Sequence, residues 1–85
     1  MYQVILEEPA QRQLRKLDRL TQRRLLRACA RLEVNPRTAQ SKRLKGMSDL
    51  YRLRVGDYRV LYRIEDKRLL VLVIALGHRR DIYKR

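Results

Sequence analysis

The chain has 85 residues, 45% of them hydrophobic, which allows one small domain with a thin core but neither two domains nor a large enzyme with a deep cofactor cleft. It carries 22 Lys and Arg against 9 Asp and Glu, a formal net charge of +13. This excess is larger than solubility requires and predicts a polyanionic partner, with nucleic acid as the first candidate.

The N-terminal part predicts a strand followed by a helix. Residues 2–6 are mostly apolar and indicate a short strand. Pro9 suits the first turn of a helix, because the backbone N–H that proline lacks would be unpaired there in any case. Apolar residues then follow at helical spacing, at Ala10, Leu14 and Leu17.

A second helix is predicted after a tight break at Asp18-Arg19. Thr21 is a suitable N-cap, since its hydroxyl can accept a hydrogen bond from an unpaired backbone N–H of the first turn. Asn35-Pro36 is expected to end this helix, because the residue before a proline avoids the helical conformation. The apolar stripe between these signals is Leu25, Ala28, Cys29 and Leu32.

The spacing of apolar residues then changes from helical to alternating. Residues 37–49 are polar and predict a loop with one short extended piece. Leu50–Val55 and Tyr58–Glu65 are predicted strands, joined by Gly56-Asp57 as a two-residue hairpin turn.

A second turn is predicted at Asp66-Lys67. Residues 68–76 are apolar at almost every position, which indicates a strand covered on both faces and ended by Gly77. The order β-α-α-β-β-β is typical of an α+β domain, here a single one over residues 1–85. We predict a twisted, mainly antiparallel sheet with a helical hairpin packed on one face, in which residues 2–6 pair with residues 68–76.

The hairpin turn determines which side chains share a face of the sheet. With a two-residue turn, Arg54 lies opposite Arg59, and Arg52 lies opposite Leu61. One face then carries Leu50, Arg52, Arg54, Arg59, Leu61 and Arg63. The other face, expected to form the core under the helices, carries Tyr51, Leu53, Val55, Tyr58, Val60, Tyr62 and Ile64 and continues in Leu69, Val71 and Val73.

The arginine face has a functional and a structural interpretation. Arg54 and Arg59 repel each other across the strand pair, so stability alone does not favour this arrangement, whereas a bound polyanion would offset the repulsion. The structural alternative is a solvated face with splayed side chains. A structural interpretation is favoured for the three alternating tyrosines and Cys29, as core residues, and for the helix arginines, as a solvated face: Arg12, Arg15, Arg19, Arg23, Arg27 and Arg31.

The tail after the last strand adds candidates for chemistry. Cleavage of RNA by its own 2′-OH needs a base, cations that stabilise the phosphorane, and an acid for the leaving 5′-oxygen. Arginines supply the positive charge but are poor acids and bases. Arg79 and Tyr83 can fold back over the arginine face, and His78 or Tyr83 are candidates for proton transfer, with solvent exposure and packing as their structural alternatives.

Several classes of site and location are disfavoured. The sequence has no converging carboxylate pair and no Gly-rich phosphate loop, which argues against two-metal phosphoryl transfer and an NTPase. One cysteine and one histidine exclude an internal disulfide and lack the ligands of a zinc site. We find no signal peptide and no apolar run long enough to cross a bilayer. We therefore expect a soluble, cytoplasmic protein without metal, cofactor or membrane partner.

Three motifs together resemble one protein family. They are L-x-G-x-x-x-x-Y-R-x-R from Leu44, G-D-Y-R-V-x-Y from Gly56 and G-H-R-R-D-I-Y from Gly77. With the N-terminal strand, the Pro-initiated helix and the Asn-Pro helix end, nearly the whole chain resembles the RelE family of type II toxins, within the RelE/ParE superfamily.

The resemblance implies a metal-independent, ribosome-dependent mRNA endonuclease. Such toxins cut the codon in the empty aminoacyl site and leave a 2′,3′-cyclic or 3′-phosphate and a 5′-hydroxyl. By position, the resemblance implies a catalytic set of Arg52, Arg54, Arg59, Arg79 and Tyr83, with His78 where relatives carry Lys or His. RNA or ribosome contacts are predicted for Lys42, Arg43, Lys45, Arg63 and Arg80.

One departure concerns the general base. The best-studied members carry lysines at the positions of Arg52 and Arg54, and one of these lysines is thought to be the base. In this chain either Tyr83 or His78 takes that role, or charge stabilisation and substrate positioning provide most of the rate.

The resemblance also implies partners. These are an acidic antitoxin that folds on binding and neutralises the toxin, the ribosome with its rRNA and mRNA, and operator DNA reached through the toxin–antitoxin complex. Two alternative functions stay open: a ParE-type inhibitor of DNA gyrase on the same fold, and a noncatalytic nucleic-acid-binding module.

Overall fold

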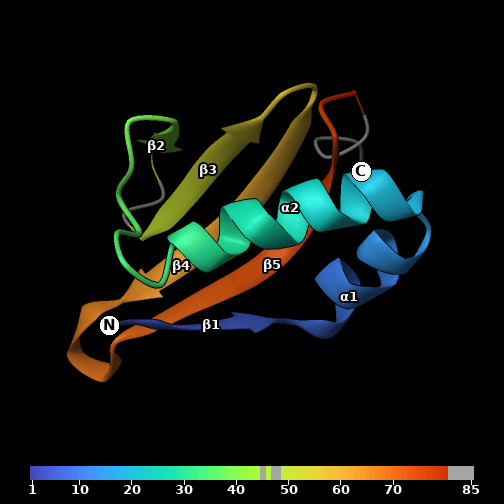
Figure 1. The fold of residues 1–85 in the computed structure, drawn as a ribbon. Coiled ribbons are helices and arrows are strands. Elements are labelled where there is room, and N and C mark those ends of the chain that lie inside the picture. Colours follow the sequence, from blue (N-terminus) through green and yellow to red (C-terminus); the bar gives the residue numbers. More distant parts are fainter. Residues whose placement is uncertain (45, 47–48, 81–85) are drawn as a thin grey trace.

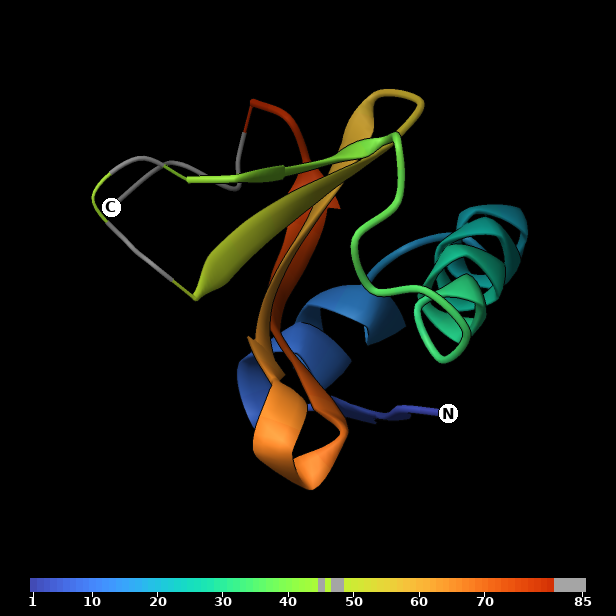
Figure 2. The same ribbon diagram turned by 90° about the vertical axis from the view of Figure 1, so that its left-hand side faces the viewer.

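The computed structural model describes residues 1–44, 46 and 49–80, which form two layers. The elements are β1 (Gln3–Leu6), α1 (Glu8–Arg15), α2 (Arg19–Arg31), β2 (Ser41–Arg43), β3 (Leu50–Val55), β4 (Tyr58–Glu65), the 3₁₀ turn η1 (Asp66–Arg68) and β5 (Leu70–His78). The strands form one sheet in the order β1-β5-β4-β3-β2. Both helices lie on one side of this twisted sheet, and no described helix or strand covers the other side (Figure 1 and Figure 2).

The strand pairing confirms the α+β class and most of the predicted topology. β1 runs parallel to β5, while the pairs β2–β3, β3–β4 and β4–β5 are antiparallel. The short extended piece expected in the loop is β2, at the edge of the sheet. In the part of the chain that the structure describes, no helix has the length and apolarity needed to cross a membrane.

The start and the end of α2 both differ from the sequence prediction. Asp18, not Thr21, is the N-cap, because its carboxylate accepts hydrogen bonds from the backbone N–H and the hydroxyl of Thr21 at 3.1 and 2.6 Å. These bonds from Thr21 hold the pKa of Asp18 below its ordinary value. The helix ends at Arg31, several residues before Asn35-Pro36, so the prediction that this pair ends the helix was wrong. The proline lies in a segment that has already left the helix.

The hairpin of β3 and β4 has the predicted register. Arg54 pairs with Arg59, and Arg52 pairs with Leu61. Gly56, at the turn, has a φ of +60°, which lies in the left-handed region that glycine adopts without steric cost. The two-residue turn therefore assigns the side chains to the two faces as expected.

The strand β5 lies two residues later than predicted. Residues 66–68 form a 3₁₀ turn, and Leu69 follows with a φ of 51°, half exposed, so its predicted place on the core face was wrong. Gly77 does not end the strand, which continues to His78. A register shift beside Leu61/Tyr62 pairs these residues with Ala75 and Val73, leaving Ile74 as the extra residue.

This bulge explains how residues of β5 before and after it can all point into the same core. Val71, Val73 and Leu76 are all buried, although an uninterrupted strand would place Val73 and Leu76 on opposite faces. The extra residue restores the alternation, so Leu76 again faces the helices. His78, two residues further, takes the same side.

The core lies between the helices and one face of the sheet, as predicted. Cys29 is 3% exposed, and burial raises the pKa of its thiol to about 11, in keeping with its interpretation as a core residue. Tyr62 is fully buried and donates a hydrogen bond to the Pro36 carbonyl at 2.6 Å. Tyr51 stacks on Tyr62 with ring centroids 5.7 Å apart, so these two tyrosines pack on the helix side.

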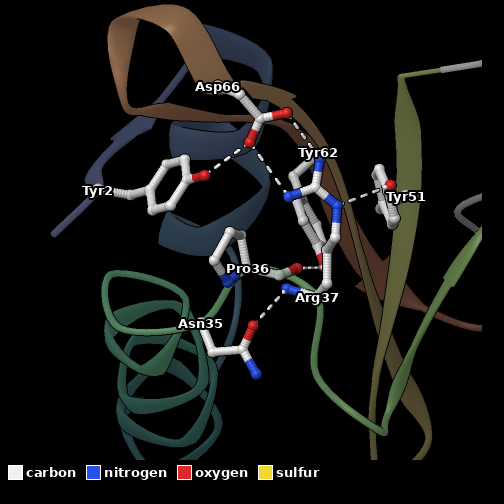
Figure 3. A network of polar contacts seen from close by, with 7 residues as sticks. All are labelled: Tyr2, Asn35, Pro36, Arg37, Tyr51, Tyr62 and Asp66. Atoms are coloured by element: carbon white, nitrogen blue, oxygen red, sulfur yellow. Dashed lines mark hydrogen bonds and ion pairs between the residues drawn. The ribbon is translucent and has the colours of Figure 1, made fainter.

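A polar network connects four parts of the chain at the end of the sheet near the N-terminus (Figure 3). The guanidinium of Arg37 binds both carboxylate oxygens of Asp66, at 3.1 and 2.8 Å, and donates through Nε to the Tyr51 hydroxyl at 3.1 Å. The hydroxyl of Tyr2 donates to Asp66 at 2.6 Å. The network thus joins the N-terminal segment, the loop after α2, β3 and η1.

We expect Asp66→Asn to lower the melting temperature by a few °C at neutral pH, since it removes the charge that Arg37 binds. The hydrogen bonds from Arg37 and then from Tyr2 hold the pKa of Asp66 below its ordinary value in the folded state. The stabilisation is therefore present at neutral pH and is lost as the pH falls through this lowered pKa. Thermal unfolding followed by circular dichroism over a pH series measures it.

The matched control is Glu65→Gln, which removes a neighbouring charge that pairs with Arg68 at 3.2 Å within the same turn. This change should shift the melting temperature less at neutral pH. In acid the carboxyl of Asp66 is protonated, so it is uncharged like the amide that replaces it in Asp66→Asn. A difference in melting temperature between these two proteins that stayed constant into acid would contradict the assignment.

Candidate functional site

A groove on the open face of the sheet gathers the predicted arginines. It has a volume of about 330 Å³ and lies across β2, β3 and β4. Arg54 of β3 sits opposite Arg59 of β4, and Lys42 of β2 sits opposite Arg52 of β3. The lining residues are Ala39, Gln40, Lys42, Arg52, Arg54 and Arg59.

The charge of the groove suits an anion. Of its described lining residues, four are cations and none is a carboxylate. Like charges on adjacent strands repel, and the repulsion is relieved when an anion binds between them. Arginines in particular bind phosphate oxygens through two parallel N–H groups. The arrangement therefore fits a phosphate-bearing ligand on the face that the helices leave open.

Arg59 is partly enclosed at the groove. Its side chain is half-buried, and one terminal nitrogen donates to the Tyr58 carbonyl at 3.5 Å, near the upper limit for a hydrogen bond. Its Nε is buried and has no hydrogen-bond partner among the described residues. A buried N–H without a partner is costly, and a ligand oxygen in the groove would satisfy it.

The predicted RNA or ribosome contacts do not all lie with this groove. Lys42 lines it, whereas Arg63 shares its face but pairs with Leu50 at the far end of the hairpin and is exposed. Arg43 pairs with Tyr51, which places it on the helix side. Lys45 lies outside the described residues.

His78 lies on the other side of the sheet from the arginines. It pairs with Tyr58, a residue of the helix side, and their rings meet edge to face at 5.5 Å. A second cavity of about 380 Å³ includes both residues, with Gln13, Lys16, Leu17, Leu76 and Gly77. The sequence interpretation placed His78 in a tail after the strand, but the longer β5 and its bulge turn this side chain towards α1.

Arg79 and Arg80 follow directly after β5 and are exposed. The backbone N–H of Arg79 donates to the Asp57 carbonyl at 2.8 Å, which holds this residue beside the β3–β4 turn. Figure 1 shows the end of β5 next to that turn. The backbone N–H of Arg80 donates to His78 Nδ1 at 3.2 Å. Tyr83 lies outside the described residues.

The sequence interpretation did not single out Gln40 and Ala39, which close one side of the groove. The Gln40 carbonyl accepts a hydrogen bond from the Arg54 N–H at 3.1 Å and so extends the edge pairing beyond β2. The polar composition of residues 37–49 gives no register for this pairing. The six helix arginines singled out from the sequence are all exposed, as predicted for a solvated face.

Comparisons with known proteins point to one group of toxins. A family model described as the ParE toxin of the type II toxin–antitoxin system parDE matches residues 4–83. A RelE-like toxin protein of Escherichia coli is 33% identical over 86 residues, covering 96% of this chain and 90% of the relative. The mRNA interferase toxin RelE of Escherichia coli K12 is 33% identical over 75 residues, covering 86% and 78%.

A solved structure shows the same fold. The chain resembles the archaeal RelE–RelB complex from Pyrococcus horikoshii with a TM-score of 0.82 and 30% identity, covering 94% of this chain and 97% of that chain.

Proposed function

Since the chain belongs to the RelE/ParE superfamily of type II toxin–antitoxin toxins, we propose that it is a ribosome-dependent endonuclease that cuts mRNA in the ribosomal A site. The observation that carries this proposal is the groove in which Lys42 and the three arginines of β3 and β4 meet. Relatives named mRNA interferases support it.

The proposed reaction is attack by the 2′-oxygen of a nucleotide on the adjacent phosphorus. The hydroxyl proton passes to a base, the new bond to the 2′-oxygen forms, and the bond to the 5′-oxygen breaks. The products are a 2′,3′-cyclic phosphate and a 5′-hydroxyl, whose proton comes from an acid. Arg52, Arg54 and Arg59 bind the phosphate and stabilise the charge that develops on it.

We assign the proton transfers to Tyr83, assisted by phosphate contacts from Arg79. His78 is less suitable, because it opens on the cavity beside α1 and not on the arginine groove. A phenol held close to cations ionises more readily, so a tyrosine that reaches the arginine groove could serve as the base.

The ribosome would supply what the groove lacks. An open groove of about 330 Å³ contacts only a short stretch of substrate and cannot by itself orient a flexible mRNA for in-line attack. The A site holds the codon in one geometry. With a net charge of +13, the protein would be drawn to rRNA by counterion release, with Arg80, Arg63 and the helix arginines as contacts.

The proposed regulator is an acidic antitoxin. The structures that this chain resembles include a RelE–RelB complex, so we propose an antitoxin segment that folds over the basic surface and neutralises it. Operator DNA would be bound through that complex.

One observation favours a second candidate function. The matching family model is that of a ParE toxin, which makes inhibition of DNA gyrase the alternative for the same fold. A gyrase inhibitor acts by binding a protein and has no need of a phosphate groove. The two candidates therefore differ in whether mRNA is cut.

The test is a single-turnover assay on ribosomes programmed with mRNA and holding an empty A site. We expect cuts within the A-site codon that require ribosomes and that Arg79→Ala slows by about tenfold or more. Ribosome-free mRNA is the control. Intact mRNA with folded, ribosome-bound protein would reject the proposal and make a gyrase supercoiling assay the next experiment.

A further inference from the structure

Gly77 occupies a position in β5 where neither backbone conformation nor packing requires glycine. It pairs with Arg59 inside the β4–β5 ladder, one residue before the strand ends. Its φ is not positive, unlike those of Gly46 and Gly56. A β-carbon built on Gly77 meets no described atom within 4 Å. Glycine in a strand is less stable than alanine, so the fold gains nothing from it.

The missing side chain would stand on the arginine face. Residues that pair directly in an antiparallel ladder point to the same side of the sheet, and Arg59 lines the groove. Gly77 therefore leaves space on this face that no described atom fills, beside the strand position of Arg59, whose Nε has no partner among the described residues. A glycine inside a strand often marks a place where a ligand backbone comes close.

This side of the groove is also open at the edge of the sheet. β1 pairs with β5 only as far as Val73, so Gly77 lies beyond the end of β1. Beyond that point no described strand pairs with this edge of β5, and the Leu76 N–H donates instead to the side-chain oxygen of Gln13 at 2.8 Å. A polymer that crosses β3 and β4 can thus leave the sheet over Gly77 without meeting another strand.

We infer that Gly77 is a substrate-positioning residue: its bare backbone lets one phosphodiester of a single-stranded RNA settle against Arg59. This inference rests on the proposed function and names the part of the substrate that the site holds. Among the described residues, the groove is lined by arginine, lysine, alanine and glutamine and by no aromatic ring. This site therefore fits the sugar–phosphate backbone better than a base.

The test compares Gly77→Ala and Gly77→Val with Ala75→Val. Ala75 lies on the same strand and face but pairs with Leu61, so the control adds two methyl groups opposite an apolar residue. The readouts are thermal unfolding, binding of a fluorescent RNA hexanucleotide at low salt, and single-turnover cleavage on programmed ribosomes.

We expect the two Gly77 variants to melt at or above the wild-type temperature, since alanine and valine suit a strand better than glycine. Gly77→Val should weaken hexanucleotide binding and slow cleavage by about tenfold or more, with Gly77→Ala intermediate. Ala75→Val should change either quantity by less than about twofold. If valine disturbs the fold, the alanine variant alone decides.

The outcomes separate this inference from the proposed function. If the wild type cuts mRNA and a folded Gly77→Val cuts equally well, or if Ala75→Val loses as much, the seat at Gly77 is rejected and the nuclease stands. If the wild type does not cut but Gly77→Val still weakens hexanucleotide binding relative to Ala75→Val, the seat stands and the nuclease is rejected.

Discussion

Arg59→Ala is expected to lower the single-turnover rate of mRNA cleavage on ribosomes by about two to three orders of magnitude. Arg59 lines the groove, faces Arg54 across the strand pair, and has a buried Nε without a partner among the described residues. A phosphorane carries more negative charge than the phosphodiester. The loss should therefore fall mainly on the rate constant and less on ribosome binding.

The matched control is Arg63→Ala. Arg63 lies on the same strand and the same face, but it is exposed and does not line the groove. Removing this charge should slow cleavage by no more than a few-fold and reduce the salt dependence of ribosome binding. Equal losses in the two variants would show that total charge, and not the groove, determines the activity.

Tyr83→Phe is expected to slow cleavage by about two to four orders of magnitude, because it removes the proposed proton-transfer group while keeping the ring. His78→Ala is expected to stay within a few-fold of the wild type. The reason is geometric: His78 pairs with Tyr58 and lines the cavity beside α1, on the side of the sheet away from the arginines.

The cleavage rates of Tyr83→Phe and His78→Ala are compared in single-turnover assays on programmed ribosomes, and the melting temperature of each variant is measured. His78→Ala removes the edge-to-face contact with Tyr58, so its melting temperature is recorded to separate packing from chemistry. A large loss in a folded His78→Ala, with Tyr83→Phe still active, would move the proton transfer to the histidine. The groove would then not contain the whole active site.

The arginine face could be predicted because local sequence determines it. A two-residue turn at Gly56-Asp57 sets the register of β3 and β4, and the period of two along a strand then assigns each side chain to a face. No long-range information enters this step. The prediction that β1 pairs with β5 is confirmed, since the apolar run marks β5 as an interior strand of the sheet. The prediction that this strand is covered on both faces was wrong, because both helices lie on one side of the sheet.

The position of His78 could not be predicted, because it depends on contacts distant in sequence. The bulge that leaves Ile74 unpaired lets both Val73 and Leu76 face the helices, and no local sequence signal predicts it. The same holds for Lys42, whose place in the groove depends on a three-residue edge strand in a polar segment. Asp18 and Thr21 are both good caps by type, so local preference did not separate them.

The order of the strands has a consequence for synthesis. Residues 3–6 pair with residues 70–73, so β1 cannot take its place in the sheet before β5 has been synthesised. The side chains of Val71, Val73 and Leu76 complete the core under both helices, and they are synthesised after both helices. Contacts so distant in sequence close late in folding. A nascent chain therefore lacks its finished sheet, and the open face that carries the arginines, until β5 has left the ribosomal exit tunnel.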